Sequence, residues 1–199
     1  MKIPFFKQFS HPKGSLGKLA GFIMSKENQK LNKWAIGCLD IQRGDQVLEI
    51  GYGSGYSMQQ MLNGDKNVFV DGADASEAMA QSAEKRLKPF IENDRARVMI
   101  GKAESLYLPE NHYNKMLSVN NFTIWDDPER ALGNLYASLK EGGRIVIMMQ
   151  PREEQASPNM TRMMGEEIYH ALTKAGFQRV SLSYRRIWPE LAVGAVGFK

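Results

Sequence analysis

The sequence has a single cysteine, few histidines and no long apolar run. Cys38 alone excludes an internal disulfide and a zinc site built from several cysteines. The 3 histidines, His11, His112 and His170, lie far apart in the chain, so we expect no metal ion. The apolar runs are far shorter than the roughly 18–20 residues that span a bilayer, and no secretion signal follows the first residues. We therefore predict a cytoplasmic protein without a membrane span.

The composition is that of an ordinary folded domain with a slight excess of positive charge. The chain has 199 residues, of which 43% are hydrophobic and 24% are charged, and its 26 Lys+Arg exceed 22 Asp+Glu by a net +4. A length near 150 residues per domain favours one main domain with a substantial core. Lysines are frequent in the first 33 residues. They indicate either a solvated amphipathic segment or a surface that binds an anionic substrate or nucleic acid.

Short apolar runs alternate with helix-like stretches through the middle of the chain. We predict strands over 47–50, 67–70, 97–100, 116–119 and 144–149, and helices over 56–62, 76–87 and 128–139. Gly142 and Gly143 are expected to stop the last of these helices. Strands that alternate with helices in this way imply crossover connections, a parallel sheet and helices on both faces.

The two ends of the chain depart from this alternation. The first 30 residues have few strand signals, and a helix is predicted over about 26–41, so we treat residues 1–30 as a helical extension. Near the C-terminus, a helix over about 160–175 precedes two strands at 179–184 and 191–197. Their short connection predicts an antiparallel pair, which brings the predicted sheet to seven strands.

A glycine-rich turn after the first strand is the most informative segment of the sequence. The run from Val47 reads as a buried strand that ends in Gly51-Tyr52-Gly53-Ser54-Gly55 and enters a helix. Glycines in this context allow a ligand to approach the backbone closely at the N-terminus of a helix. The dinucleotide fingerprint would need glycine at position 56, which is tyrosine, so a nicotinamide enzyme is disfavoured. Here an acid, Glu49, precedes three alternating glycines.

This acid-x-Gly-x-Gly-x-Gly segment resembles the first motif of class I S-adenosylmethionine-dependent methyltransferases. The resemblance extends over about residues 44–150 and more loosely to the C-terminus. It implies an α/β, Rossmann-like fold with a seven-stranded, mostly parallel sheet, an antiparallel C-terminal strand and helices on both faces. It further implies that residues 31–199 form the cofactor-binding domain, that S-adenosyl-L-methionine is the cofactor, and that Glu49, Gly51, Gly53 and Gly55 help to bind it.

Two further segments fit the cofactor site that this resemblance implies. Gly72-Ala73-Asp74-Ala75-Ser76 is similar to the segment in which an acid binds the ribose hydroxyls, a role that suits a carboxylate because it accepts from both. Asp71 is the alternative for that role, and Ser76 is also expected to cap the next helix.

Residues 101–106 resemble the segment beside the adenine, where Ala103 would offer backbone contacts and Glu104 a carboxylate. Lys102 stands where the family commonly has an aspartate that accepts from the adenine amino group, and a lysine cannot accept.

The residues after the fourth strand are expected to face the methyl group. Asn120 is predicted to contact the methionine end of the cofactor. Phe122 and Trp125 either line the acceptor pocket or belong to the core. The segment lacks the Asn-Pro-Pro-Tyr run associated with methylation of amide or base nitrogens, and no Pro-Cys nucleophile occurs.

We therefore predict an enzyme that methylates a small molecule at O, N or S, with no nucleic acid partner. An RNA or protein methyltransferase that uses the basic first 33 residues, and a binding protein without catalysis, are the alternatives. A general base is needed only if the acceptor must lose a proton, so we assign no catalytic residue; His11 and Tyr184 are the conceivable bases. Residues 5–30 and 150–165, the latter containing three methionines, are the candidate lids over the acceptor.

Overall fold

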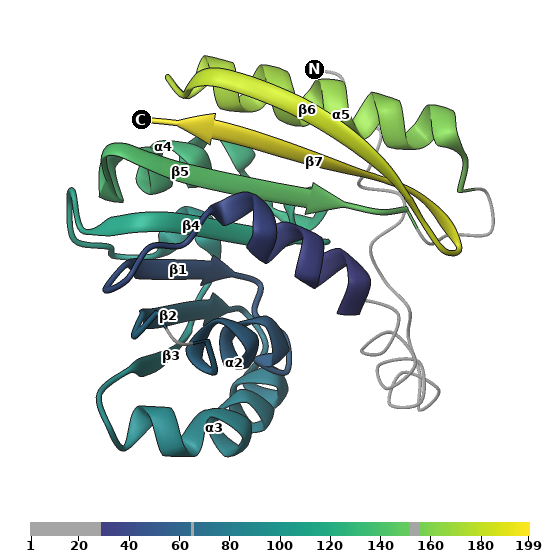
Figure 1. The fold of residues 1–199 in the computed structure, drawn as a ribbon. Helices are drawn as coiled ribbons and strands as arrows, with labels where there is room; N and C mark the ends of the chain where they lie inside the picture. Colours follow the sequence, from purple (N-terminus) through teal and green to yellow (C-terminus); the bar gives the residue numbers. More distant parts are fainter. Residues whose placement is uncertain (1–28, 65, 152–155) are drawn as a thin grey trace.

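The structure is a computed structural model that describes residues 29–64, 66–151 and 156–199. It consists of one seven-stranded sheet with helices packed on both faces (Figure 1). The predicted extension over residues 1–30 lies almost entirely outside the described residues. After a helical segment at residues 29–39, the elements follow in the order β1 (Gln46–Ile50), α2 (Tyr56–Leu62), β2 (Phe69–Asp74), α3 (Glu77–Ile91), β3 (Ala96–Ile100), η2 (Ala103–Ser105), β4 (Tyr113–Val119), η3 (Phe122–Ile124), α4 (Pro128–Ser138), β5 (Leu139–Met149), α5 (Pro158–Lys174), β6 (Gln178–Ile187) and β7 (Glu190–Phe198).

The strands lie in the order β3-β2-β1-β4-β5-β7-β6. β1 to β5 pair in parallel, whereas β7 is antiparallel to both β5 and β6, so its arrow runs opposite to that of β5 in Figure 1. The predicted parallel sheet with an antiparallel C-terminal strand is confirmed. The antiparallel strand does not form the edge, however, because β7 inserts between β5 and β6 and leaves β6 outermost. The strand order reverses between β1 and β4, and ligands of open α/β sheets bind beside such a point.

Two hydrophobic layers hold the helices to the sheet. Residues 29–39, α2 and α3 pack on one face through a cluster that includes Leu31, Met58 and Leu87. α4 and α5 pack on the other face through a cluster that includes Leu132 and Ile168. All five side chains are fully buried, and each contributes about 1.5–3 kcal/mol relative to an exposed position.

The expected helix stop at Gly142 and Gly143 is wrong. α4 already ends at Ser138, and β5 begins at the next residue and contains both glycines. Gly142 has a φ of +70°, and the pairing of β5 with β4 shifts register between Leu139 and Arg144. The glycines therefore allow an irregularity at the start of a strand, rather than ending a helix.

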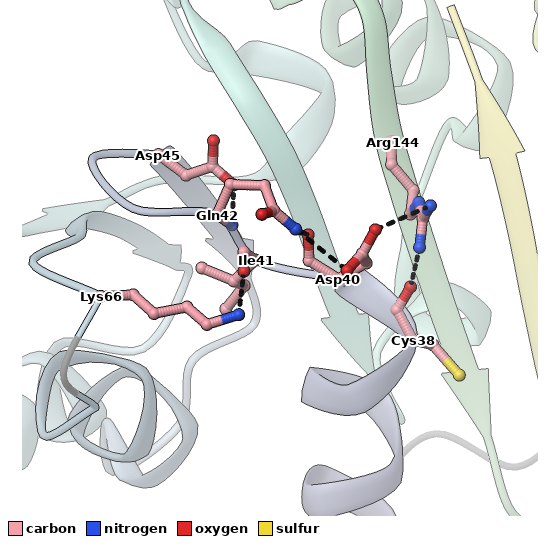
Figure 2. Close-up of polar contacts among 7 residues, drawn as sticks. All are labelled: Cys38, Asp40, Ile41, Gln42, Asp45, Lys66 and Arg144. Carbon is pink, nitrogen blue, oxygen red and sulfur yellow. Dashed lines mark hydrogen bonds and ion pairs between the residues drawn. The ribbon is translucent and has the colours of Figure 1, made fainter.

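Polar contacts near the amino ends of the parallel strands fix the helical segment at residues 29–39. Arg144 of β5 donates to the carbonyl oxygen of Cys38 at 2.8 Å and approaches Asp40 at 3.5 Å (Figure 2). Lys66 donates to the carbonyl oxygen of Ile41, just beyond the helix. These cations satisfy carbonyl groups at the C-terminus of the helix, where positive charge is favoured.

Candidate cofactor site

A cavity of about 480 Å³ lies at the carboxyl ends of the parallel strands. Residues at or just after the ends of β1, β2, β3 and β4 line it, together with residues of η2 and η3: Ile50, Gly51, Ala73, Asp74, Ala75, Gly101, Lys102, Ala103, Glu104, Asn121, Thr123, Ile124, Trp125 and Asp126. A larger cavity of about 860 Å³ runs along β3 and α3 and contains none of the eight residues predicted to bind the cofactor. We therefore place the candidate site in the smaller cavity, because four of the eight, Gly51, Asp74, Ala103 and Glu104, line it.

The glycine loop joins β1 to α2 in a conformation that favours glycine. Gly51, Gly53 and Gly55 all have positive φ angles, of +77°, +53° and +75°. A Cβ on Gly51 would lie 2.3 Å from Cγ of Asn121, so this position admits no side chain. A Cβ on Gly53 would meet no atom within 4 Å, so the chain leaves open space at that point. Of the three glycines, Gly51 lines the cavity directly.

Asp74 ends β2 with both carboxylate oxygens held by backbone donors. The N–H of Gly53 donates to one oxygen and the N–H of Ser76 to the other, each at 2.9 Å. Ser76 also caps α3 as predicted, since its hydroxyl accepts from the N–H of Met79. Asp71, the alternative ribose ligand, lies outside the smaller cavity and accepts a hydrogen bond from the Tyr113 hydroxyl at 2.8 Å. The structure therefore favours Asp74 over Asp71.

Glu49 is 1% exposed, and it lies behind the glycine loop without lining the cavity. One carboxylate oxygen accepts from the Ser57 hydroxyl, whereas Oε2 is buried and has no hydrogen-bond partner among the described residues. Burial raises the pKa of Glu49 to about 7, the hydroxyl of Ser57 opposes this shift, and the negative charge of Asp74 adds to it. The charge of Asp74, which lines the cavity, therefore acts on the buried carboxyl group of Glu49 behind it.

The segment after β3 forms one wall of the cavity. Ala103 and Glu104 are buried, at 3% and 9% exposure, and both line the cavity. Asn134 of α4 donates to the carbonyl oxygen of Glu104 at 3.1 Å, which fixes the short helix η2 against α4. Lys102 lines the mouth, where its ammonium group lies 2.5 Å from a carboxylate oxygen of Asp126.

Among the residues after β4, Asn121 lines the cavity and Asn120 does not. Asn120 has a φ of +51°, its side chain accepts from the N–H of Gln150 at 2.8 Å, and it does not line the cavity. Its neighbour Asn121 lines the cavity and accepts from the indole N–H of Trp125 at 2.6 Å. Trp125 also lines the cavity, whereas Phe122 is buried against it in the core. In the sequence, Asn121 stands out only as the neighbour of the predicted residue Asn120.

Other considered residues lie elsewhere. The hydroxyl of Tyr184 packs against Gly165 of α5, away from the cavity lining, and His11 is outside the described residues. In the described parts of the chain, no cluster of three or more His, Cys, Asp or Glu side chains could hold a metal ion. No helix within them is long and apolar enough to cross a membrane.

The donor and acceptor groups fit a ligand that is partly cationic and carries vicinal hydroxyls. The buried Oε2 of Glu49 and the nearby charge of Asp74 favour a positive charge beyond the loop. Asp74 is a fixed acceptor inside the cavity, which suits a ribose, and Trp125 offers an aromatic surface. S-adenosyl-L-methionine, with a sulfonium, an ammonium and a ribose, meets these requirements.

Known proteins resemble this chain in sequence and in fold. The family described as "Methyltransferase domain" matches residues 47–143. "Uncharacterized methyltransferase YdaC" of Bacillus subtilis is 44% identical over 181 residues, which cover 91% of this chain and 98% of the relative. "Malonyl-[acyl-carrier protein] O-methyltransferase 1" of Ilyobacter polytropus is 31% identical over 101 residues, 51% of this chain but 36% of that protein. The chain thus spans only about a third of that second relative.

Solved structures share the fold at lower sequence identity. The methyltransferase in a complex with the Trm112 activator of Haloferax volcanii has a TM-score of 0.74 at 18% identity, covering 90% of this chain and 92% of its own. An S-adenosylmethionine-dependent methyltransferase of Aquifex aeolicus has a TM-score of 0.67 at 19% identity, covering 83% and 88%. Both likenesses extend over most of the described sheet and helices.

Proposed function

The chain belongs to the class I S-adenosylmethionine-dependent methyltransferases, and from that premise we propose that it methylates a small molecule at an O, N or S atom. The cavity at the carboxyl ends of β1 to β4 carries this proposal, because it combines a fixed acid for the ribose with an aromatic wall. A cavity of about 480 Å³ suits a small ligand.

We assign the cofactor to the cavity through the predicted residues. Asp74 would accept from the ribose hydroxyls, and Gly51 would let the cofactor approach the backbone. Ala103 and Glu104 would line the adenine. Gly53 acts through Asp74, because its N–H already donates to that carboxylate. We assign Asn121, rather than Asn120, to the methionine end of the cofactor, because Asn121 lines the cavity. The side chain of Asn120 instead accepts from the backbone N–H of Gln150.

Glu49 would contribute negative charge to the site without lining the cavity. Its carboxylate is buried beside Asp74, and a cationic ligand in the cavity would favour its ionised form. We propose that the unsatisfied Oε2 compensates the positive charge of the cofactor from behind the loop. Gly55, the N-cap of α2, would contribute through its backbone instead.

The cofactor supplies an electrophilic methyl group on a sulfonium, which is transferred by in-line displacement. The residues of the chain therefore need to align the acceptor with that methyl group and to exclude water. Trp125 is fixed for such a role, because its indole N–H is held by Asn121 and its ring packs on Phe122. No residue is assigned as a general base.

Some of the named relatives support a small-molecule acceptor. "Trans-aconitate 2-methyltransferase" of Variovorax paradoxus, which is 28% identical over 123 residues, is named for a small acid, whereas the malonyl-[acyl-carrier protein] O-methyltransferase is named for an acyl group on a carrier protein. "Ubiquinone/menaquinone biosynthesis C-methyltransferase UbiE" of Psychromonas ingrahamii, at 23% over 119 residues, is named for quinone biosynthesis and for methylation at carbon. Carboxylic acids and quinols therefore belong in any screen, beside thiols, phenols and amines.

The test is a transfer assay with methyl-labelled cofactor and separate panels of small molecules, total RNA and unmodified protein. Labelling of one small-molecule class, lost in Asp74→Ala, supports the proposal. Labelling of RNA or protein alone would replace it with the macromolecular alternative. Tight binding of S-adenosylhomocysteine without transfer to any panel would favour a binding protein that lacks catalysis.

A further inference from the structure

A further cavity, of about 430 Å³, lies between the helical segment at residues 29–39 and α2. We call it the lysine cavity, and its lining residues are Gln29, Lys30, Lys33, Ile36, Tyr56 and Gln60. It shares none of these residues with the cavity assigned to the cofactor. The lysine cavity is therefore a separate space, and the cofactor assignment does not account for it.

The lysine cavity lies on the side of the sheet where the parallel strands end. The helical segment ends near Arg144 and Ile41, at the amino ends of these strands, so its first residues lie toward the carboxyl ends. Figure 1 shows this helix beginning on the side to which the arrows of β1 and β5 point. The glycine loop joins the two cavities, because Gly51 lines the cofactor cavity and Tyr56 lines the lysine cavity.

Helical periodicity places the two lysines on the face that does not pack on the sheet. Leu31, Ala35 and Leu39 are fully buried, whereas Lys30 and Lys33 are exposed. Residues three apart on a helix are neighbours on its surface, so the two ammonium groups belong to the same wall of the cavity.

The charges of these lysines are not compensated by acidic side chains. Within the described residues neither lysine has an ion pair or a hydrogen bond, and no Asp or Glu of those residues lines the cavity. Arg86 adds a third positive charge, since its guanidinium carbon lies 5.9 Å from the ring centroid of Tyr56. Arg86 donates to uncharged groups, the carbonyl oxygen of Ser54 and the amide of Gln59. A hollow surrounded by charges of one sign attracts a ligand of the opposite sign.

The uncharged lining residues suit an organic anion. The hydroxyl of Tyr56 and the amides of Gln29 and Gln60 can donate hydrogen bonds beside the ammonium groups, which are donors only. Ile36 adds an apolar surface to the same lining, which suits the carbon skeleton of an acid better than an inorganic ion.

We propose that the lysine cavity binds a carboxylate group of the methyl acceptor, so that this chain methylates an organic acid. The inference rests on the proposed function and deepens it, because it names the class of acceptor. Lys30 and Lys33 hold the carboxylate, and the rest of the acceptor extends across the glycine loop toward the cofactor. The two lysines determine specificity and take no part in the transfer itself.

The cofactor is the other source of a carboxylate, because its methionine end carries one. The separate linings of the two cavities favour the acceptor as the source. Calorimetry with S-adenosylhomocysteine and with methylthioadenosine, which lacks the methionine carboxylate, distinguishes the two sources.

Three pairs of acceptors that differ only in a carboxylate test the proposal. They are thioglycolate and its amide for sulfur, para-hydroxybenzoate and its amide for oxygen, and β-alanine and its amide for nitrogen. Transfer from methyl-labelled cofactor gives kcat and KM for the wild type, for the double variant Lys30→Met with Lys33→Met, and for Lys85→Met. Lys85 is the matched control, because it is an exposed lysine of α3 outside the lysine cavity and has no ion pair among the described residues.

At low salt the wild type and Lys85→Met should prefer the acid of at least one pair by about tenfold in kcat/KM, as charge-assisted hydrogen bonds imply. The double variant should reduce this ratio to within about threefold by raising KM for the acid, with kcat for the amide unchanged. Replacement of both lysines by arginine should retain the preference, because both charges remain. High salt should weaken the preference of the wild type, because the lysines are exposed.

An unchanged preference for the acid in the double variant would overturn the inference. Transfer by the wild type to neutral acceptors alone, or to amides as readily as to acids, would also overturn it and leave the proposed function standing. A double variant that lost about tenfold in affinity for S-adenosylhomocysteine, but none for methylthioadenosine, would assign the lysine cavity to the cofactor instead. A wild type that bound no S-adenosylhomocysteine would overturn the proposed function itself.

Discussion

Replacement of Glu49 by glutamine should stabilise the protein and weaken cofactor binding, and both effects should depend on pH. Burial raises the pKa of this carboxyl group from 4.5 to about 7. At 1.36 kcal/mol per pH unit, this rise of the pKa corresponds to a free-energy penalty of roughly 3 kcal/mol for the ionised carboxylate in the folded state. The shift means that the folded state binds the Glu49 proton more tightly than the unfolded state does.

The sign of the stability effect follows from that difference. Below about pH 4.5 the carboxyl group is neutral in both states, so no penalty applies. As the pH rises from 4.5 toward 7, the unfolded state gains by ionising while the folded state does not, and the free energy of unfolding falls. Above about pH 7 the full penalty of roughly 3 kcal/mol applies in the wild type. Glutamine cannot ionise, and its carbonyl oxygen can still accept from Ser57.

Urea unfolding at pH 5 and pH 8 measures the effect. The advantage of Glu49→Gln should grow by roughly 2 kcal/mol between the two values, since part of the penalty is already present at pH 5. Glu110→Gln removes an exposed carboxylate of the same size and controls for the loss of one charge. An advantage of Glu49→Gln that is the same at both pH values would refute the raised pKa.

Cofactor binding should change in the opposite direction. A cationic ligand favours the ionised carboxylate, so affinity of the wild type for S-adenosylmethionine should increase from pH 6 to pH 8. Glu49→Gln should bind more weakly at pH 8 and show a flatter pH profile. A variant that is more stable yet binds as tightly as the wild type would show that Glu49 does not compensate the charge of the cofactor.

Four further changes to the chain test the assignment of the site and of its surroundings. Asp74→Ala should weaken S-adenosylmethionine and S-adenosylhomocysteine alike by about 1.5–3 kcal/mol, because both carry the ribose, and calorimetry would show it. Asp71→Ala should leave binding unchanged but lower the free energy of unfolding by about 1–3 kcal/mol, because it orphans the Tyr113 hydroxyl. Gly53→Val should reduce cofactor binding in a folded protein, since a φ of +53° disfavours valine and its methyl groups would fill the open space that the cofactor needs. Deletion of residues 1–24, which lie outside the described residues, should abolish transfer while cofactor affinity stays within a few fold; full turnover would place the acceptor site elsewhere.

The sequence alone predicted the elements whose formation depends on neighbouring residues. The alternation of apolar runs with helical patterns predicted the parallel sheet, and the three glycines after Glu49 predicted the turn that all three positive φ angles confirm. Ser76 was correctly predicted as a helix cap. In each case the structural requirement is local: a periodicity, a backbone conformation or a hydrogen bond to the next turn.

Local patterns were less informative about register. Gly142 and Gly143 suit the end of a helix and an irregularity in a strand equally, and pairing of β5 with β4 decided between them. The sequence offers no means to distinguish the roles of Asn120 and Asn121. In the structure Asn120 has a positive φ and its side chain accepts from Gln150, whereas Asn121 lines the cavity.

The tertiary structure alone decided contacts between distant segments. It inserted β7 between β5 and β6, tied Asp74 to Gly53, and brought Asp126 to Lys102 across the cavity mouth. A periodicity cannot report such contacts, because they depend on which strand ends become neighbours in the sheet. The sequence therefore determined the local elements and their turns, and the order of the strands decided which of their residues meet.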